Sequence, residues 1–213
     1  MLNKYARPLF TKLLTPLASL LLRLGVSPDV VTIVGTLGVS LGALVFYPRG
    51  EFLVGTLVIT AFVFSDTVDG IMARRSGRSS LWGAYLDSTL DRVADASVFS
   101  GLVLFYAGGQ NLRPDSILQV RPGIMAALAL GCLILGMVVS YAKARAEGLG
   151  MTANVGIAER AERLVAVLVT TGFVGWFVPE IFLAVVLALL ALASLVTVVQ
   201  RMLEVRRQAL DVA

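Results

Sequence analysis

Long uncharged runs of apolar residues alternate with short polar connections along the whole chain. Five of the runs approach or reach the roughly 20 residues that cross a bilayer as a helix, and a shorter one follows the first. They lie at residues 30–47, 52–65, 96–112, 122–142, 164–179 and 181–200. Proline and glycine, which favour helix ends, set the boundaries between them. The pattern predicts an all-α integral membrane protein with six transmembrane helices, at about 29–47, 52–75, 82–108, 122–146, 160–177 and 179–203.

The first 24 residues show a different pattern, in which basic residues interleave with leucines at three- and four-residue spacings. This spacing favours an amphipathic helix that lies in the headgroup layer of a membrane. A cleaved signal peptide is the alternative, but no small-residue cleavage site precedes the next apolar run. We therefore expect a juxtamembrane helix at 1–24, a six-helix domain at 25–205 and a cytoplasmic tail at 206–213.

Composition and charge agree with a membrane protein. Apolar residues make up 57% of the chain and charged residues 15%, which is too apolar for an ordinary soluble fold. Most of the 18 lysines and arginines fall in the N-terminal segment, at 74–78, at 143–163 and from 201 onward. Basic residues gather on the cytoplasmic side of membrane proteins, so both termini are expected there. The basic excess is then a topology signal, which argues against nucleic acid as a partner.

The residues available for chemistry are restricted. The chain has no histidine and only one cysteine, Cys132, in the middle of an apolar run. This excludes histidine-based acid–base catalysis, histidine metal ligands, intramolecular disulfides and thiolate clusters. Any metal chemistry must therefore depend on carboxylates.

Carboxylates are concentrated in and beside the second and third predicted helices. Asp66 and Asp69 are three residues apart, and Asp87 and Asp91 are four apart, so each pair lies on one helix face. Charged residues inside a membrane are costly and usually functional. Because consecutive helices with a short connection are antiparallel, the two pairs are expected to face each other near the cytoplasmic surface.

Four converging carboxylates require a positive partner. At about 5 Å and an effective dielectric near 20, each like-charge pair costs roughly 3 kcal/mol. Ligation by oxygen alone favours Mg²⁺ or Mn²⁺, and four carboxylates balance two divalent ions in a site that also handles phosphates. Gly70 and Gly83 adjoin these acids and leave room for a flat ligand. Helix packing through small residues is the alternative explanation for a single glycine.

These residues form a complete motif. Asp66-Thr67-Val68-Asp69-Gly70-Ile71-Met72-Ala73-Arg74, eight residues, Gly83, three residues, Asp87, three residues and Asp91 resemble the signature of the CDP-alcohol phosphotransferases at all eight fixed positions. The helix pattern extends the resemblance over almost the whole chain. Within the family, the chain is similar to actinobacterial members that join CDP-diacylglycerol to inositol 1-phosphate and release CMP.

The resemblance implies roles for individual residues. Asp66, Asp69 and Asp87 would hold two divalent cations, Mg²⁺ or Mn²⁺, and Asp91 would contact metal and act as the general base. Gly70, Ala73 and Gly83 would make room for the cytidine, with Arg74 near the nucleotide phosphates. Asp29 and Thr32 lie in a segment where many relatives have Pro-Asn; they are expected to contact the nucleotide, although an amide donor is missing. The resemblance also implies a homodimer in a bacterial plasma membrane, with the active site facing the cytoplasm.

The phosphate of the acceptor needs cations at the cytoplasmic side. Basic residues at the cytoplasmic ends of the last three predicted helices are the candidates: Lys143, Arg145, Arg160, Arg163 and Arg201. Convergence on an anion is one interpretation. Contact with lipid headgroups is another, and pairing with neighbouring glutamates is a third.

Several alternatives stay open at this point. Glycerol 3-phosphate is the alternative acceptor, and a cation transporter is a remote alternative because carboxylates in membranes also mark ion pathways. Asp95, one turn beyond Asp91, is expected to be structural, for example by pairing with Arg92. Gly38 and Gly42 permit close helix contact, within one chain or between two.

Overall fold

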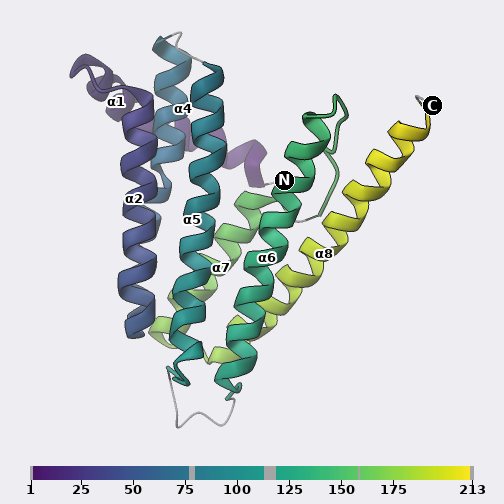
Figure 1. Ribbon diagram of the computed structural model, residues 1–213. Helices are drawn as coiled ribbons and strands as arrows, with labels where there is room; N and C mark the ends of the chain where they lie inside the picture. The colour runs from purple at the N-terminus through teal and green to yellow at the C-terminus, as the bar shows by residue number, and fades with distance from the viewer. Residues whose placement is uncertain (1, 77–79, 113–118, 158, 212–213) are drawn as a thin grey trace.

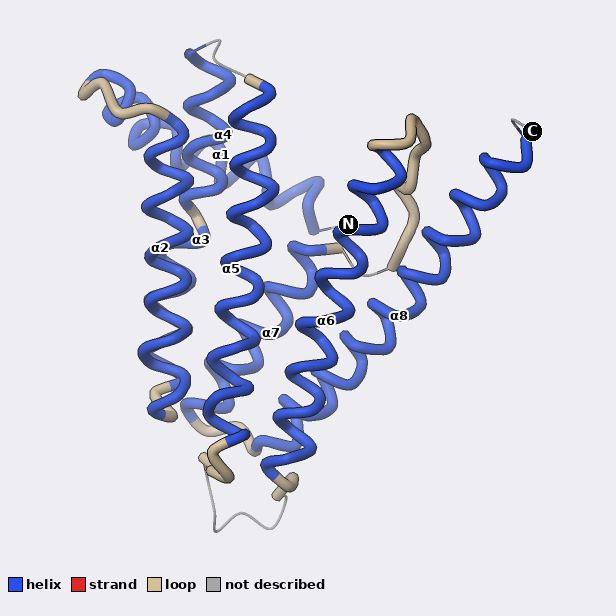
Figure 2. The backbone as a smooth tube through the Cα atoms, in the orientation of Figure 1, coloured by secondary structure: helices blue, strands red, loops and turns tan. Residues whose placement is uncertain are grey.

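The structure, a computed structural model, describes residues 2–76, 80–112, 119–157 and 159–211, with the side chains from Leu13 onward. These residues form helices and turns, and no strand is found among them (Figures 1 and 2). The α-helices are α1 (Leu2–Arg23), α2 (Pro28–Phe46), α3 (Phe52–Val63), α4 (Ser65–Ser76), α5 (Leu81–Ala107), α6 (Pro122–Glu147), α7 (Arg160–Trp176) and α8 (Glu180–Asp211), and Tyr47–Arg49 form a short 3₁₀ helix after α2.

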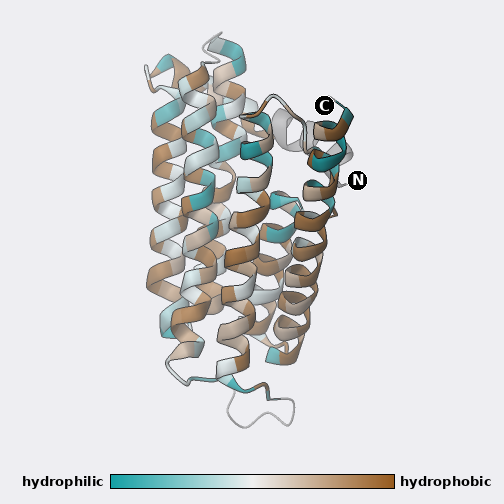
Figure 3. Cartoon of the chain, turned by 45° about the vertical axis from the view of Figure 1, so that its right-hand side comes forward, coloured by the Kyte–Doolittle hydropathy of each residue, from teal (hydrophilic) through white to brown (hydrophobic). Residues whose placement is uncertain are grey.

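The helices from α2 to α8 run lengthwise in one bundle, whereas α1 lies across it near one end (Figure 1). That end also carries the start of α2, the end of α4 and the start of α5, and we call it the α4–α5 end. The hydropathy colouring shows apolar residues along most of the bundle and more polar ones toward the α4–α5 end (Figure 3). The polar chemistry is therefore gathered toward one end of a mostly apolar body.

Four helical segments of the described chain are long and apolar enough to cross a membrane. They are Pro28–Arg49, Phe52–Ser76, Pro122–Glu147 and Glu180–Asp211. The other two expected spans differ for visible reasons: α5 carries four charged side chains in its first 15 residues, and α7 is 17 residues long. An integral membrane protein is confirmed in this coarser form, and the count of six spans stays a prediction.

The second predicted helix, expected to be continuous over 52–75, is broken. α3 ends at Val63 and α4 begins at Ser65. Gly35 of α2 lies directly against the Ser65 side chain, where a Cβ would overlap it. The break places Asp66 in the first turn of α4, where the N-terminal end of a helix favours a negative charge.

Small residues bring helices of the same chain together. A Cβ on Gly42 would lie 3.1 Å from Ile59, and Gly38 packs against the ring of Phe62. On α5, a Cβ at Gly101 would lie 2.6 Å from the carbonyl oxygen of Ala43 on α2. The Gly38 and Gly42 pair therefore serves contacts inside the chain, and the homodimer stays a prediction.

The N-terminal helix α1 is attached to α4. α1 packs residues around Ala18 against Met72 of α4, and Arg75 of α4 donates a 2.7 Å hydrogen bond to Ser19. The side chains of the first twelve residues, on which much of the amphipathic pattern depends, lie outside the described ones.

The predicted end of the last helix at 203 is wrong, because α8 continues to Asp211. In its last turns Glu204 accepts hydrogen bonds from Arg207 and Gln208.

Candidate active site

The expected carboxylates meet between α4 and α5 near the α4–α5 end. Asp69 and Asp91 each interact electrostatically with both Asp66 and Asp87, so the four carboxylates lie in one region between the two helices. Asp69 is buried and Asp87 is exposed. The two i, i+3 and i, i+4 pairs therefore converge as the helix spacing predicts.

Asp69 is held from α2. The hydroxyl of Thr32 donates a 2.6 Å hydrogen bond to its Oδ2 atom, and both side chains are buried. A hydrogen bond behind a ligand fixes its orientation. Thr32, expected to contact the nucleotide, is placed by this geometry behind an expected metal ligand.

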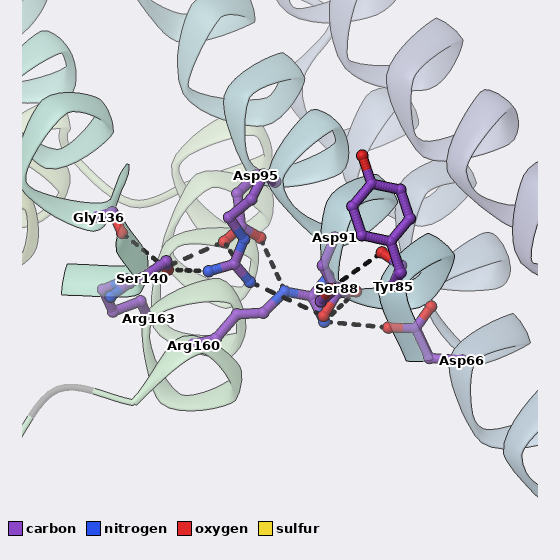
Figure 4. Close-up of polar contacts among 10 residues, drawn as sticks. Asp66, Tyr85, Ser88, Asp91, Asp95, Gly136, Ser140, Arg160 and Arg163 are labelled. Carbon is purple, nitrogen blue, oxygen red and sulfur yellow. Dashed lines mark hydrogen bonds and ion pairs between the residues drawn. The ribbon is translucent and has the colours of Figure 1, made fainter. Parts of the chain in front are cut away.

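Arg160 lies among the acids, which the sequence did not indicate. Its Nη1 atom is 3.1 Å from Oδ2 of Asp66 and 2.7 Å from Oδ1 of Asp91, and its Nε atom is 3.2 Å from Oδ1 of Asp95 (Figure 4). Because Asp66 and Asp91 turn toward this guanidinium, no three carboxylates of the described residues gather tightly enough to hold one ion.

The donor set nevertheless suits hard divalent cations. All the acidic side chains offer oxygen, the ligand that Mg²⁺ and Mn²⁺ prefer. Arg160 also shows that a positive group fits between Asp66 on α4 and Asp91 on α5. The donor set therefore fits a divalent-metal site, and Asp66 and Asp91 would have to release the guanidinium in order to hold an ion.

The small residues of the motif lie beside this acidic group. A Cβ at Gly83 would lie 3.8 Å from Oδ1 of Asp29, which brings the first turns of α2 and α5 together. At Gly70 a Cβ would lie 3.3 Å from Nη1 of Arg74. Asp29 and Ala73 are partly buried and Arg74 is exposed. Gly83 of α5 thus lies against Asp29 of α2, and Gly70 lies against Arg74 of the same helix, while contact of these residues with a nucleotide stays a prediction.

A cavity of about 880 Å³ opens beside the acids, between α5, α6, α7 and α8. Its wall includes Asp91 and four of the five basic residues expected for the acceptor phosphate, together with residues that the sequence did not single out. The described lining is Tyr85, Ser88, Thr89, Asp91, Arg92, Met137, Val139, Ser140, Tyr141, Lys143, Ala144, Glu147, Glu159, Arg160, Arg163 and Arg201. Arg145 is exposed and is absent from this described lining, so its part in acceptor binding stays a prediction.

The cations of this cavity are fixed by surrounding backbone and small residues. Arg201 donates to the carbonyl oxygens of Val139 at 2.5 Å and Val155 at 3.1 Å. Arg163 is only 3% exposed and fits against Gly136, where a Cβ would lie 3.3 Å from its Nη2 atom. These arginines are built into the fold, which is unlike the freely solvated side chains that bind lipid headgroups.

The connection after α6 explains the position of Arg160. It folds back along the bundle before α7 begins (Figure 2). Gly156 has a φ of 140° and packs against Thr197 of α8, whose hydroxyl accepts a 3.2 Å hydrogen bond from the Ile157 amide. The retraced connection starts α7 at the level of the acids.

Comparisons with known proteins agree with this site. The sequence profile of the CDP-alcohol phosphatidyltransferase family matches residues 25–200. Phosphatidylinositol phosphate synthase of Streptomyces avermitilis is 54% identical over 99% of this chain and 85% of its own. The enzyme of the same name from Cutibacterium acnes is 44% identical, over 93% and 94% of the two chains.

Solved structures show the same fold. The crystal structure of Mycobacterium tuberculosis phosphatidylinositol phosphate synthase with CDP-DAG bound has a TM-score of 0.81 and 41% identity, covering 91% of this chain and 94% of that one. A second crystal structure of that enzyme, in complex with manganese and citrate, has a TM-score of 0.80 and 42% identity, covering 90% and 88% of the two chains. On these matches and on its complete aspartate motif, the chain belongs to the CDP-alcohol phosphatidyltransferase family.

Proposed function

We propose that this protein transfers the phosphatidyl group of CDP-diacylglycerol to inositol 1-phosphate and releases CMP. The observation that carries the proposal is the cavity that places Asp91 on one wall with Lys143, Arg160, Arg163 and Arg201. A base therefore faces a pocket rich in cations, as an acceptor with both a hydroxyl and a phosphate requires. Similarity to phosphatidylinositol phosphate synthases supports the choice of acceptor.

The aspartates of α4 and α5 would hold the diphosphate of CDP-diacylglycerol through two cations, Mg²⁺ or Mn²⁺. A relative crystallised with manganese supports this assignment. When bound, such ions neutralise the bridging phosphates and improve CMP as a leaving group. Thr32 keeps Asp69 oriented, and Gly70, Ala73 and Gly83 leave room for the cytidine, with Arg74 and Asp29 beside it.

Asp91 accepts the proton of the attacking hydroxyl. General-base catalysis requires a carboxylate within hydrogen-bond reach of that hydroxyl, and the cavity brings an acceptor to Asp91. Lys143, Arg160, Arg163 and Arg201 fix the phosphate of the acceptor, so that its hydroxyl faces the phosphorus attached to diacylglycerol. Cys132 is buried and donates to the carbonyl oxygen of Leu187, so transfer is direct, without a thiol intermediate.

The membrane placement follows from the same features. α5 and α7 lie in the bundle beside the four apolar spans, and we include them as the fifth and sixth transmembrane helices. α1 exposes Leu13, Leu17 and Leu20 while lying across the bundle, as an interfacial helix would. The basic residues near the α4–α5 end support the assignment of that end, and of the active site, to the cytoplasmic side of a bacterial plasma membrane. A homodimer is proposed from the family alone.

The acceptor assignment has a direct test. Purified protein in lipid receives CDP-diacylglycerol and, in separate reactions, inositol 1-phosphate or glycerol 3-phosphate. We expect CMP release and phosphatidylinositol phosphate with the first acceptor, and little product with the second. Phosphatidylglycerophosphate as the main product would assign the second acceptor.

A chelator series tests the metal requirement in the same assay. Removal of divalent cations is expected to abolish CMP release, and Mg²⁺ or Mn²⁺ is expected to restore it. Full turnover without divalent cations would exclude the metal site. The family assignment already removes the cation-transporter alternative.

A further inference from the structure

Asp95 joins three arginines. It lies on α5 one turn beyond Asp91 and is 8% exposed. Its Oδ1 atom is 3.2 Å from Nε of Arg160, and its Oδ2 atom is 3.6 Å from Nη2 of Arg163 and 3.8 Å from Nη2 of Arg92. Figure 4 shows the Asp95 side chain of α5 near Arg160 and Arg163 of α7. One buried carboxylate thus partners three guanidinium groups.

The same arginines are also held from α6. Arg92 donates a hydrogen bond to the hydroxyl of Ser140, and Arg163 fits against Gly136. Asp95 is therefore the common anion of a cluster that ties α5, α6 and α7 together around the cavity. Pairing with Arg92 alone, the structural role expected from the sequence, is only part of this arrangement.

Asp95 does not reach the cavity itself. Arg92, Arg160 and Arg163 all belong to its described lining, and Asp95 does not. The carboxylate therefore lies outside the described wall of this cavity, in contact with the arginines that form it. Any influence that it has on binding must act through their positions.

The positive charges of the three arginines indicate what the Asp95 carboxylate does. Three guanidinium groups around one point repel one another, and without a shared anion they would move to other carboxylates. For Arg160 these are Asp66 and Asp91, which it already contacts, and for Arg92 the nearest is Asp91 at 3.8 Å. Asp95 thus gives Arg160 a partner other than Asp66 and Asp91 and holds Arg92 and Arg163 beside it. Each guanidinium retains further N–H donors, since arginine has five.

We propose that Asp95 is a positioning residue that holds Arg92, Arg160 and Arg163 in the arrangement that binds the acceptor's phosphate monoester. The inference rests on the proposed function, because it specifies how the acceptor side of that site is organised. It assigns Arg92 and Asp95 to acceptor recognition in addition to the cations already named.

The test is Asp95→Asn, which keeps the shape of the side chain and removes its charge. We expect the apparent KM for inositol 1-phosphate to rise roughly 10-fold or more, as loss of charge-assisted contacts does. The kcat at saturating acceptor should stay within about threefold and the KM for CDP-diacylglycerol within about twofold, because a positioning effect is confined to acceptor binding. An unchanged acceptor KM in the folded variant would overturn the proposal.

Glu147→Gln separates position from charge. Glu147 lines the same cavity, is exposed and lies 3.9 Å from Lys143, away from Asp95. Removing its charge makes the cavity more positive and should lower the KM for an anionic acceptor. If Asp95 acted only through its charge, Asp95→Asn would lower the KM in the same way. Opposite signs for the two variants support positioning, and equal signs overturn it.

Two further variants guard against a folding defect. Ser97→Ala removes another buried polar side chain of α5, one that contacts Ser40 at 3.0 Å, and should leave both KM values unchanged. Gly136→Ala alters no charge but crowds the Arg163 guanidinium, and should raise the acceptor KM. If Asp95→Asn does not fold, an unchanged acceptor KM in folded Gly136→Ala overturns the proposal.

The proposed function and this inference fail separately. If wild-type protein forms no lipid from inositol 1-phosphate, the acceptor assignment is wrong, and the variants are compared with glycerol 3-phosphate, which is also a phosphate monoester. If wild-type protein is active and Asp95→Asn keeps its acceptor KM, only the positioning role is wrong.

Discussion

The hydroxyl of Thr32 on α2 donates a 2.6 Å hydrogen bond to the Asp69 carboxylate on α4. Both residues are buried, so water does not compete for this contact. This hydrogen bond joins α2, whose first turn lies beside Gly83, to α4, which carries Asp66 and Asp69. The orientation of Asp69 is therefore set by a helix that contributes no carboxylate to the motif pairs.

Thr32→Val is expected to weaken divalent-metal activation. Valine keeps the shape of threonine but cannot hold Asp69, and loss of such an outer contact typically costs 10- to 100-fold in metal affinity. The measurement is the Mn²⁺ concentration that gives half-maximal CMP release. Thr32→Ser keeps the hydroxyl and should remain close to wild type. Equal activation curves for Thr32→Val and wild type would contradict the role given to the hydrogen bond.

Asp91→Asn should separate chemistry from nucleotide binding. Removal of a general base lowers turnover by roughly 10² to 10⁴, while Asp66, Asp69 and Asp87 remain to hold the cations and the nucleotide. CDP binding measured by calorimetry in Mn²⁺ should thus be largely retained. Asp66→Asn is the comparison, because it should weaken metal and nucleotide binding together. Near-normal turnover of Asp91→Asn would show that another group takes the proton.

The convergence of the aspartates was predictable because it depends on local geometry. Spacings of three and four residues put Asp66 with Asp69 and Asp87 with Asp91 on helix faces, and a short connection makes the helices antiparallel. The grouping of Lys143 and Arg163 in one cavity also followed from their place at helix ends. These features follow from residue spacing and position within individual helices.

Long-range packing decided the rest. The break at Phe64 arises where Ser65 meets Gly35, and no pattern within 52–75 marks it. Arg160 reaches Asp66 only because the connection before α7 folds back, with Gly156 packed on Thr197 of α8. In the sequence, only the presence of Gly156 hinted at this turn. A glycine residue alone does not reveal that its φ angle is positive.

Arg163→Gln is expected to affect the acceptor and spare the nucleotide. A charge-assisted hydrogen bond to a phosphate contributes about 1.5 to 3 kcal/mol, so the apparent KM for inositol 1-phosphate should rise roughly 10- to 150-fold. The KM for CDP-diacylglycerol should change little, because α4 and α5 hold the nucleotide.

Arg206→Gln is the charge control for that variant. Arg206 is exposed on the last turns of α8, outside the described cavity lining, and its loss should leave both KM values near wild type. Equal small losses for Arg163→Gln and Arg206→Gln would point to general surface electrostatics.

Gly101→Ala should destabilise the protein, although alanine is normally the better helix former. The new Cβ would lie 2.6 Å from the carbonyl oxygen of Ala43 and 3.1 Å from the Tyr47 side chain, which forces α2 and α5 apart. Overpacking of this kind costs about 1 to 3 kcal/mol. Gly131→Ala on α6 is the matched control, because its Cβ would meet no atom of the described residues within 4 Å. It should stabilise the helix by about 0.5 to 1 kcal/mol. Thermal unfolding in detergent measures both, and a Tm for Gly101→Ala at or above that of wild type would show that α2 and α5 do not pack this closely.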